Sequence, residues 1–205
     1  MTKPKLFGIS DSRAIRAIWG IEETGIDYEH VPVSYGADSK ADDYLAVNPN
    51  GRIPVLQIGE GETARFLPES NAACWYVAHG SALIPADRFA QADMLRWMFF
   101  EQYNHEPNVA TLRFWMQFVG EANLSDAQRG QIEAKRTAGR AALALMDQHL
   151  ADHAFLCGAA PTLADIALFP YTHVADEGGL ALDNHPHILA WITRIEALPG
   201  FVAMN

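Results

Sequence analysis

The stretch NPNGRIPVL, residues 48–56, places Pro54 directly before what the pattern predicts to be a buried strand. Proline has no backbone donor, and a sheet pairs nearly all of its donors. Pro54 also pushes Ile53 towards extended geometry, and an X–Pro bond adopts the cis form for only about 0.5–1 kcal/mol. A cis bond would turn the backbone of Ile53 outward, where its amide and carbonyl could pair with an extended peptide. The alternative is a proline that marks an edge strand or the end of a turn.

Strand and helix signals alternate on both sides of this stretch, over residues 1–80. The predicted elements are a strand at 5–9, a helix at 12–25, a strand at 28–33, hairpin strands at 53–58 and 64–67, and a helix at 69–80. The first helix has its apolar residues on one face and ends at Gly25. This βαβ-ββα order predicts an α+β domain with a mixed four-stranded sheet, the layout of thioredoxin-like domains.

The pattern changes beyond residue 80. Residues 81–88 predict a linker, and residues 89–205 carry helical periodicity throughout. Two capping-box patterns occur here, in which a hydroxyl side chain and a residue three positions later cap a helix start reciprocally. They are Ser125 with Gln128, before a helix to about Leu150, and Thr162 with Asp165, before a buried helix. The sequence therefore predicts a second, all-helical domain.

Composition and charge disfavour several classes of protein. The formal charge of −10 and the isoelectric point near 5.1, without a cluster of lysine or arginine, disfavour nucleic-acid binding. The sequence has no run of about 20 apolar residues and no apolar stretch typical of a secretory signal. We therefore expect no membrane span and a cytoplasmic protein. Cys74 and Cys157 lie far apart and outside any CxxC motif, which favours reduced thiols.

Glu69 and Ser70 open the last predicted helix of the first domain. A helix N-terminus has unpaired amides and a partial positive charge, so a small carboxylate binds there, helped here by the Ser70 hydroxyl. Glu69 could hold the ammonium group of the same ligand, and the pair would then recognise a free amino-acid head. The alternative is that the two residues only start the helix.

Ser12 lies where the first strand leads into the first helix, and its hydroxyl could donate to a ligand sulfur. A free thiol has a pKa of about 8.5, so making it a thiolate near neutrality takes roughly 3 kcal/mol. One hydrogen bond to a charged acceptor supplies about 1.5–3 kcal/mol and the helix terminus about 0.3–1 kcal/mol more. Alternatively Ser12 is only an N-cap, and Ser10 competes for either role.

The helical domain offers weaker candidates. Tyr103 and His105 precede Pro107, which would kink or end their helix, so they are polar candidates for a second substrate or for a surface cap. His149 and His153 have the i, i+4 spacing of zinc ligands on a helix, but no third ligand is adjacent. We expect no metal site.

Four segments together resemble the cytosolic glutathione S-transferases. They are SDSRAIRAIW, NPNGRIPVL, LPESNAACWYV and PTLADIALFPY, and they occur in that family's order and spacing. The resemblance covers nearly the whole chain. It implies a thioredoxin-like domain, residues 1–80, that binds glutathione, and a helical domain, residues 89–205, that supplies a hydrophobic pocket for the second substrate. It also implies a homodimer that uses glutathione as co-substrate in detoxification.

The resemblance implies roles for residues that bind the tripeptide. Ile53 and Pro54 match the segment whose backbone pairs with the cysteinyl part of glutathione. Glu69 and Ser70 match the pair that holds its γ-glutamyl head.

The resemblance also suggests how the thiol and the far end of the tripeptide are held. Ser12 matches the thiolate-stabilising serine of bacterial, theta-like members. Lys40, or Ser39 beside it, could meet the glycyl carboxylate, and Arg52 is a further candidate.

The leading hypothesis is therefore an enzyme in which the thiolate of bound glutathione attacks a hydrophobic electrophile. Within enzymes, the alternatives are glutathione-dependent reduction of disulfides or peroxides, and isomerisation. A protein-interaction module is the alternative from a different class, because some relatives keep the fold and act by binding partners. The intact NPNGRIPVL and ES segments argue against that module here.

Overall fold

The computed structural model describes residues 3–204, which form two compact units. One unit contains the described residues up to Ile84 together with those from Pro199 onward, and the other spans Pro85–Leu198. The expected helical domain, 89–205, is therefore wrong at its end, because the last residues pack with the first unit. The two units divide between Ile84 and Pro85, within the segment 81–88 that was expected to be a linker, and a helix begins at the last residue of that segment, Arg88.

The first unit contains the predicted mixed sheet of four strands. The strands are β1 (Lys5–Phe7), β2 (Glu29–Val31), β3 (Val55–Ile58) and β4 (Arg65–Pro68). Their order is β2-β1-β3-β4, with β2 parallel to β1, and with β3 antiparallel to both β1 and β4. The thioredoxin-like arrangement is thus confirmed.

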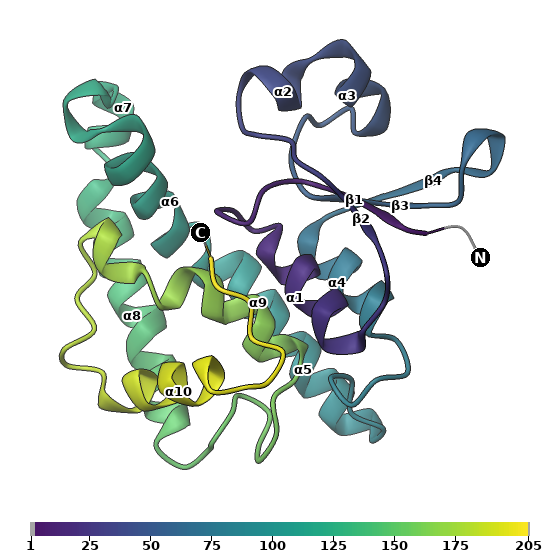
Figure 1. Ribbon diagram of the computed structural model, residues 1–205. Coiled ribbons are helices and arrows are strands. Elements are labelled where there is room, and N and C mark those ends of the chain that lie inside the picture. Colours follow the sequence, from purple (N-terminus) through teal and green to yellow (C-terminus); the bar gives the residue numbers. More distant parts are fainter. Residues whose placement is uncertain (1–2, 205) are drawn as a thin grey trace. The chain divides into compact units, whose positions relative to one another are not determined.

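Side chains alternate across this sheet and build a core on each face. The helices are α1 (Ile15–Thr24), α2 (Ala37–Lys40), α3 (Asp42–Val47) and α4 (Ser70–Ala78). Leu6 and Leu56 pack with the apolar residues of α1 and α4. Their neighbours Phe7 and Val55 pack on the opposite face, with Tyr44 of α3. Figure 1 shows α1 and α4 on one side of the sheet and α2 and α3 on the other.

The end of the chain returns to the first unit through three apolar contacts. The ring of Phe201 meets the ring of Trp19 edge-on, with centroids 5.7 Å apart. Val202 and Met204 pack against the core formed by α1 and α4. These contacts explain why the final residues belong to the sheet unit.

The second unit is helical, as predicted. Its α-helices are α5 (Arg88–Phe100), α6 (Val109–Arg113), α7 (Asp126–Arg129), α8 (Ile132–Leu150), α9 (Leu163–Thr172) and α10 (Pro186–Glu196). Two π-helical segments, Glu101–His105 and Phe114–Val119, extend α5 and α6. Every residue of α9 is buried, and α9 packs against α5 and α6. Across the described residues, none of the helices is both long and apolar enough to span a membrane.

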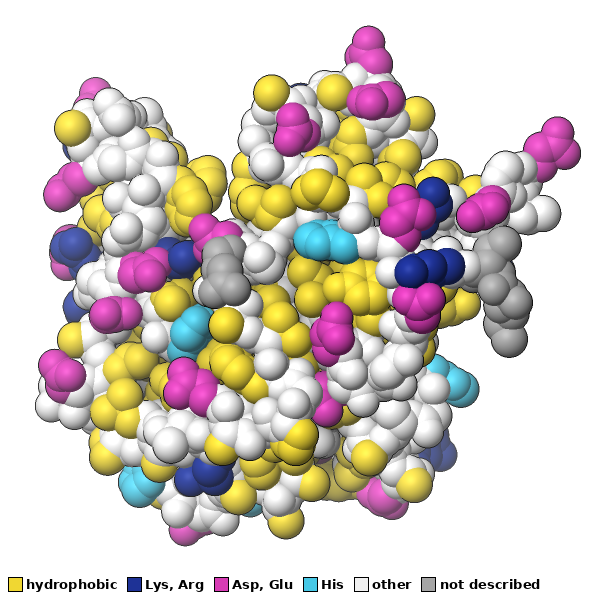
Figure 2. Space-filling model, in the orientation of Figure 1, with side chains coloured by type: hydrophobic (Ala, Val, Ile, Leu, Met, Phe, Trp, Pro, Cys, Tyr) yellow, Lys and Arg dark blue, Asp and Glu magenta, His cyan; other side chains and the backbone are white. Residues whose placement is uncertain are grey.

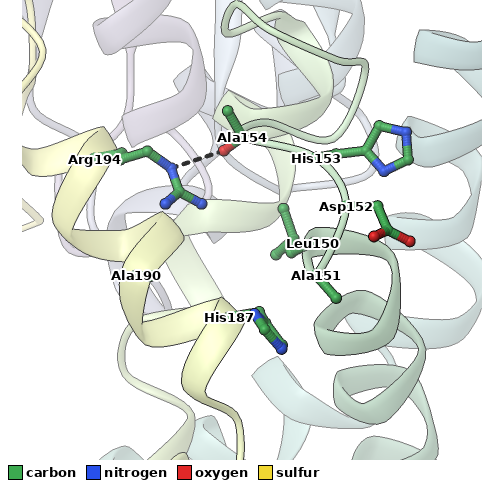
Figure 3. Close-up of a pocket in the computed structure, with 8 residues that line it drawn as sticks. All are labelled: Leu150, Ala151, Asp152, His153, Ala154, His187, Ala190 and Arg194. Atoms are coloured by element: carbon green, nitrogen blue, oxygen red, sulfur yellow. Dashed lines mark hydrogen bonds between the residues drawn. The ribbon is translucent and has the colours of Figure 1, made fainter.

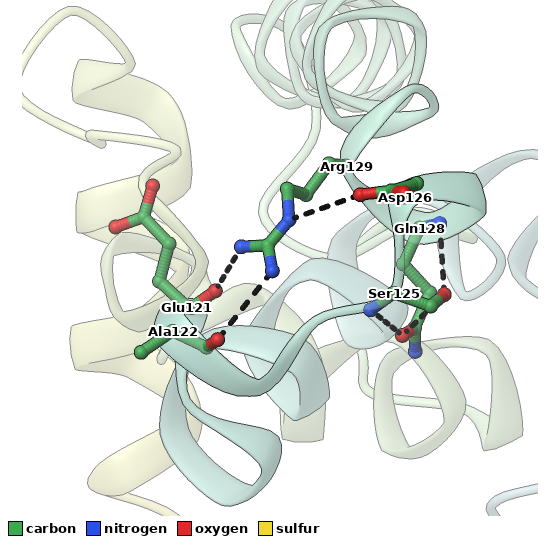
Figure 4. Close-up of polar contacts among 6 residues, drawn as sticks. All are labelled: Glu121, Ala122, Ser125, Asp126, Gln128 and Arg129. Atoms are coloured by element: carbon green, nitrogen blue, oxygen red, sulfur yellow. Dashed lines mark hydrogen bonds and ion pairs between the residues drawn. The ribbon is translucent and has the colours of Figure 1, made fainter.

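Both predicted capping boxes are present. The Ser125 amide donates to Oε1 of Gln128 at 2.8 Å, and the Gln128 amide donates back to Oγ of Ser125 at 3.3 Å (Figure 4). The expected single helix to Leu150 is wrong, because α7 ends at Arg129 and α8 begins at Ile132. Gly130 lies at this break. The amide of Gln131 donates to the carbonyl of Gln128, three residues earlier, rather than four residues back as in an α-helix.

Candidate functional site

Asn48 organises the loop that leads to the cis proline. Its Oδ1 accepts from the amide of Asn50 at 3.1 Å, and its Nδ2 donates to the carbonyl of Arg52 at 2.7 Å. The Tyr44 hydroxyl donates to the same Arg52 carbonyl at 2.8 Å. Burial raises the pKa of Tyr44 to about 12, so the hydroxyl keeps its proton at neutral pH. These bonds hold the backbone just before Ile53 in one conformation.

Ile53 combines a buried side chain with an unused backbone. The Ile53–Pro54 bond is cis, which confirms that prediction. Ile53 as a whole residue is 2% exposed, and its side chain packs in the core beside Val33 and Val55. Within residues 3–204, neither its amide nor its carbonyl makes a hydrogen bond. Because unpaired backbone groups are rare beside a core, this residue presents one donor and one acceptor for an extended ligand.

Gly51 is expected to be irreplaceable in this loop. It has φ +59°, and a Cβ there would lie 2.7 Å from the Ser39 carbonyl oxygen and 2.6 Å from Nζ of Lys40. Gly51→Ala should therefore lower the free energy of unfolding by about 1–3 kcal/mol, measured by urea denaturation. Gly61→Ala is the matched control, because its φ is +54° and no atom lies within 4 Å of its Cβ position. Equal losses in the two variants would contradict the predicted clash.

The predicted partners of a terminal carboxylate lie beside the same loop. Lys40 is exposed, and its Nζ donates to the carbonyl of Asn50 at 3.2 Å. The Arg52 side chain is exposed as well. Ser39 is 1% exposed, and its hydroxyl lies 3.5 Å from the carbonyl of Gly36. The two cations can therefore meet an anion in solution, whereas the Ser39 hydroxyl is buried.

Glu69 has an unusual backbone where β4 leads into α4. Its φ is +75° and its ψ is +118°, and it alone among the described non-glycine residues has positive φ. Such a conformation costs about 1–3 kcal/mol and is found mostly at functional sites. It leaves the Glu69 side chain exposed beside the unpaired amides that begin α4. Next to Ser70, the buried Oδ1 of Asn71 accepts no hydrogen bond from any described residue.

The residue that donates a hydrogen bond to Ser70 was not identified from the sequence. Arg16 of α1 is fully buried, and its Nη1 donates to Oγ of Ser70 at 3.1 Å. Ser70 is 2% exposed. The two residues are 54 positions apart, and a charge in an amphipathic helix normally indicates a solvent-facing side chain. The available signal was that Arg16 is the one polar side chain in an otherwise apolar run, residues 14–21.

Ser12 is buried at the start of the turn that leads into α1. Its hydroxyl donates to the carbonyl of Ile9 at 2.6 Å and accepts from the amide of Ala14 at 3.0 Å. The side chain is 1% exposed. Ser12 therefore holds the turn before α1, but it is not the N-cap of that helix, which is Ala14, and its single hydrogen points to the Ile9 carbonyl.

The candidates in the helical unit separate into exposed and buried residues. Tyr103, in the first π-helical segment, is 84% exposed. His105 is fully buried, and its Nε2 lies 3.0 Å from the hydroxyl of Thr172. Because the Thr172 hydroxyl donates to Leu168, it accepts from the histidine. Phe114 and Phe118, whose rings stack with centroids 5.8 Å apart, are half exposed on the second π-helical segment.

A pocket of about 330 Å³ lies between the end of α8 and α10 (Figure 3). Its polar side chains come from Asp152, His153, His187 and Arg194, and Nε of Arg194 donates to the carbonyl of Ala154 at 2.9 Å. No predicted glutathione contact lines this pocket.

Two stacked histidines, His149 in the last turn of α8 and His153 just beyond that helix, each contact a backbone carbonyl. Nε2 of His149 lies 2.9 Å from the carbonyl of Leu156, and Nδ1 of His153 lies 2.9 Å from the carbonyl of His149. Burial lowers the pKa of His149. In the part of the chain that the structure describes, no group of three or more histidine, cysteine or acidic side chains is arranged to hold a metal ion.

On the face that Figure 2 shows, the negative charge is spread rather than gathered. On the face shown in Figure 2, acidic side chains occur at many separate places and basic ones more sparsely. Such a surface attracts no polyanion, which leaves local cations and helix termini to bind a small anionic ligand.

Comparisons with known proteins agree with this geometry. The family described as "Glutathione S-transferase, N-terminal domain" matches residues 12–79, and "Glutathione S-transferase, C-terminal domain" matches residues 129–194. Glutathione S-transferase 3 of Zea mays is 32% identical, over 98% of this chain and 92% of the relative. A glutathione S-transferase structure from Pseudomonas fluorescens Pf-5 is 36% identical, with 99% of each chain covered and a TM-score of 0.89. The structure of a theta class glutathione S-transferase from Xanthomonas axonopodis pv. citri with glutathione bound is 29% identical, with 100% of each chain covered and a TM-score of 0.84.

Proposed function

We propose, because the chain belongs to the glutathione S-transferase family, that it binds glutathione on the sheet unit and activates the bound thiol towards a hydrophobic electrophile. The observation that carries this proposal is Ile53, whose unpaired amide and carbonyl stand beside a buried side chain. An extended cysteinyl residue satisfies both groups as a short added strand. The γ-linked tripeptide then has its sulfur near the turn at Ser12 and its head near Glu69.

The γ-glutamyl head has complementary partners at the start of α4. Its carboxylate accepts from the first amides of the helix and from the Ser70 hydroxyl, with the helix dipole adding to the attraction. Its ammonium group pairs with the exposed Glu69 carboxylate. At the other end, Lys40 or Arg52 meets the glycyl carboxylate.

Ser12 serves the thiol in this mechanism. Its hydrogen turns from the Ile9 carbonyl to the sulfur of glutathione. The thiol loses its proton to solvent, and the hydrogen bond from Ser12 stabilises the resulting thiolate. The sulfur lone pair then forms a bond to the electrophilic carbon, and the leaving group departs with its bonding electrons. The helical unit exposes Tyr103 and half-exposes the stacked rings of Phe114 and Phe118, which is apolar surface of the kind that a hydrophobic electrophile contacts.

Family membership also supports a cytoplasmic homodimer that works without a metal ion. Light scattering coupled to gel filtration measures the mass directly, and we expect twice the 22.6 kDa of one chain. A monomer at micromolar concentration would contradict the dimer.

Titration calorimetry with reduced glutathione tests the proposal. We expect one binding site per chain, together with conjugation of an aryl halide in a coupled absorbance assay. Binding without conjugation, but with reduction of a disulfide or peroxide, would assign the reductase chemistry instead. Absence of binding would remove the glutathione-dependent function altogether and favour an interaction module.

A further inference from the structure

We infer that Arg16 is a positioning residue, which orients the Ser70 hydroxyl so that its hydrogen is donated to the carboxylate of the γ-glutamyl head. This inference rests on the proposed function, because it assumes that the head group of glutathione lies at the start of α4. It assigns a role to a buried cation that does not itself touch the ligand.

The contact is enclosed within the sheet unit. Arg16 is fully buried, and its Nη1 lies 3.1 Å from Oγ of Ser70. Helices α1 and α4 pack closely enough for the Arg16 side chain to contact Ser70. At Gly20 of α1, an added Cβ would lie only 2.8 Å from Sγ of Cys74 in α4. The guanidinium therefore reaches Ser70 from within the packed interface of α1 and α4.

The chemistry of the two groups fixes the direction of the hydrogen bond. A guanidinium has five donors and no acceptor, so the Ser70 oxygen must accept from it. The hydroxyl hydrogen then has to be donated elsewhere, and no described residue accepts it. A serine without this cation could instead turn its hydrogen inward. With Arg16 in place, the Ser70 hydrogen points away from the guanidinium and is available to the ligand.

The positive charge of Arg16 also favours donation of the Ser70 hydrogen to an anionic ligand. Burial raises the pKa of Cys74 in α4 to about 12, and the field of Arg16 opposes that rise. The charge of Arg16 therefore acts on α4 as far as Cys74, in the middle of the helix. A cation behind a hydroxyl strengthens the hydrogen bond that the hydroxyl donates to an anion. The arrangement thus selects a ligand whose head carries a carboxylate.

A double-mutant cycle tests the inference. Glutathione binding is measured by calorimetry for the wild type, Arg16→Met, Ser70→Ala and the double variant. We expect each single variant to bind about tenfold more weakly, as for one lost charge-assisted hydrogen bond. The double variant should also be about tenfold weaker, because Arg16 acts through Ser70. Losses that multiply to about a hundredfold, or unchanged affinity in Arg16→Met, would overturn the inference.

Two further measurements separate positioning from folding. Arg16→Lys keeps a cationic donor, so its affinity should return to within about threefold of wild type. If Arg16→Met does not give a folded protein by thermal unfolding, the cycle is repeated with Arg16→Gln. A wild-type protein that does not bind glutathione refutes the proposed function, whereas wild-type binding with an additive cycle refutes only the role of Arg16.

Discussion

Turnover of the Ser12→Ala variant should fall by about 10- to 100-fold, because one hydrogen bond to a thiolate contributes about 1.5–3 kcal/mol. Glutathione affinity should change much less, since the contacts at Ile53 and Ser70 remain. The apparent pKa in the profile of kcat/KM against pH should rise by about one to two units, towards the value of a free thiol. Losing thiolate stabilisation raises the thiol pKa, so the deficit is largest near pH 6.5 and shrinks towards pH 9.

The pH profile distinguishes this role from the structural role of the same hydroxyl. Ser12 also accepts from the Ala14 amide, so its loss weakens the turn and lowers stability without moving a pKa. Ser10→Ala is the matched control two positions earlier, and it should keep the wild-type rate and profile. The reverse pattern would assign the thiolate to Ser10. A wild-type rate and profile in Ser12→Ala would remove it from the mechanism.

The features predictable from sequence were those encoded locally. The apolar face of α1 and its end at Gly25 follow from helical spacing, and Gly25 takes the left-handed conformation there, with φ +67°. Both capping boxes depend on two side chains three positions apart. Proline chemistry allowed the cis form at Ile53–Pro54 as one of two interpretations, and the family resemblance of the segment favoured it. In each case the signal and the structure it specifies lie within one turn of chain.

The features that escaped prediction depend on short elements or distant contacts. α2 and α3 have four and six residues, too few for a periodic pattern to appear. The return of Phe201 to Trp19 joins positions at opposite ends of the chain. For the candidate site, the loop residues and the α4 start were foreseeable, but the support from Arg16 was not, because a buried arginine resembles a surface one in sequence.

Asp165→Asn should cause the largest loss of stability, about 3–5 kcal/mol in the free energy of unfolding. Asp165 is fully buried at the start of α9 and accepts four hydrogen bonds. Its Oδ1 accepts from the Leu156 amide and from Nε1 of Trp191, both at 2.9 Å. Its Oδ2 accepts from the Thr162 amide at 2.9 Å and from the Thr162 hydroxyl at 3.3 Å. Asparagine keeps one acceptor and turns an NH₂ group against the other donors.

The same aspartate-to-asparagine change at an exposed helix start shows how much of the stability loss comes from burial of the carboxylate and how much from its position in the first turn of a helix. Asp126 is in the first turn of α7 with a fully exposed side chain, and its ion pair with Arg129 is long, at 3.9 Å. Asp126→Asn should leave urea and thermal unfolding nearly unchanged, because solvent replaces what the carboxylate provides. At the buried Asp165, solvent cannot replace the hydrogen bonds that the carboxylate accepts. The donors left unpaired in Asp165→Asn belong to the loop before α9, the cap of α9, and α10. Comparable small effects in both variants would mean that the helical unit does not depend on this carboxylate.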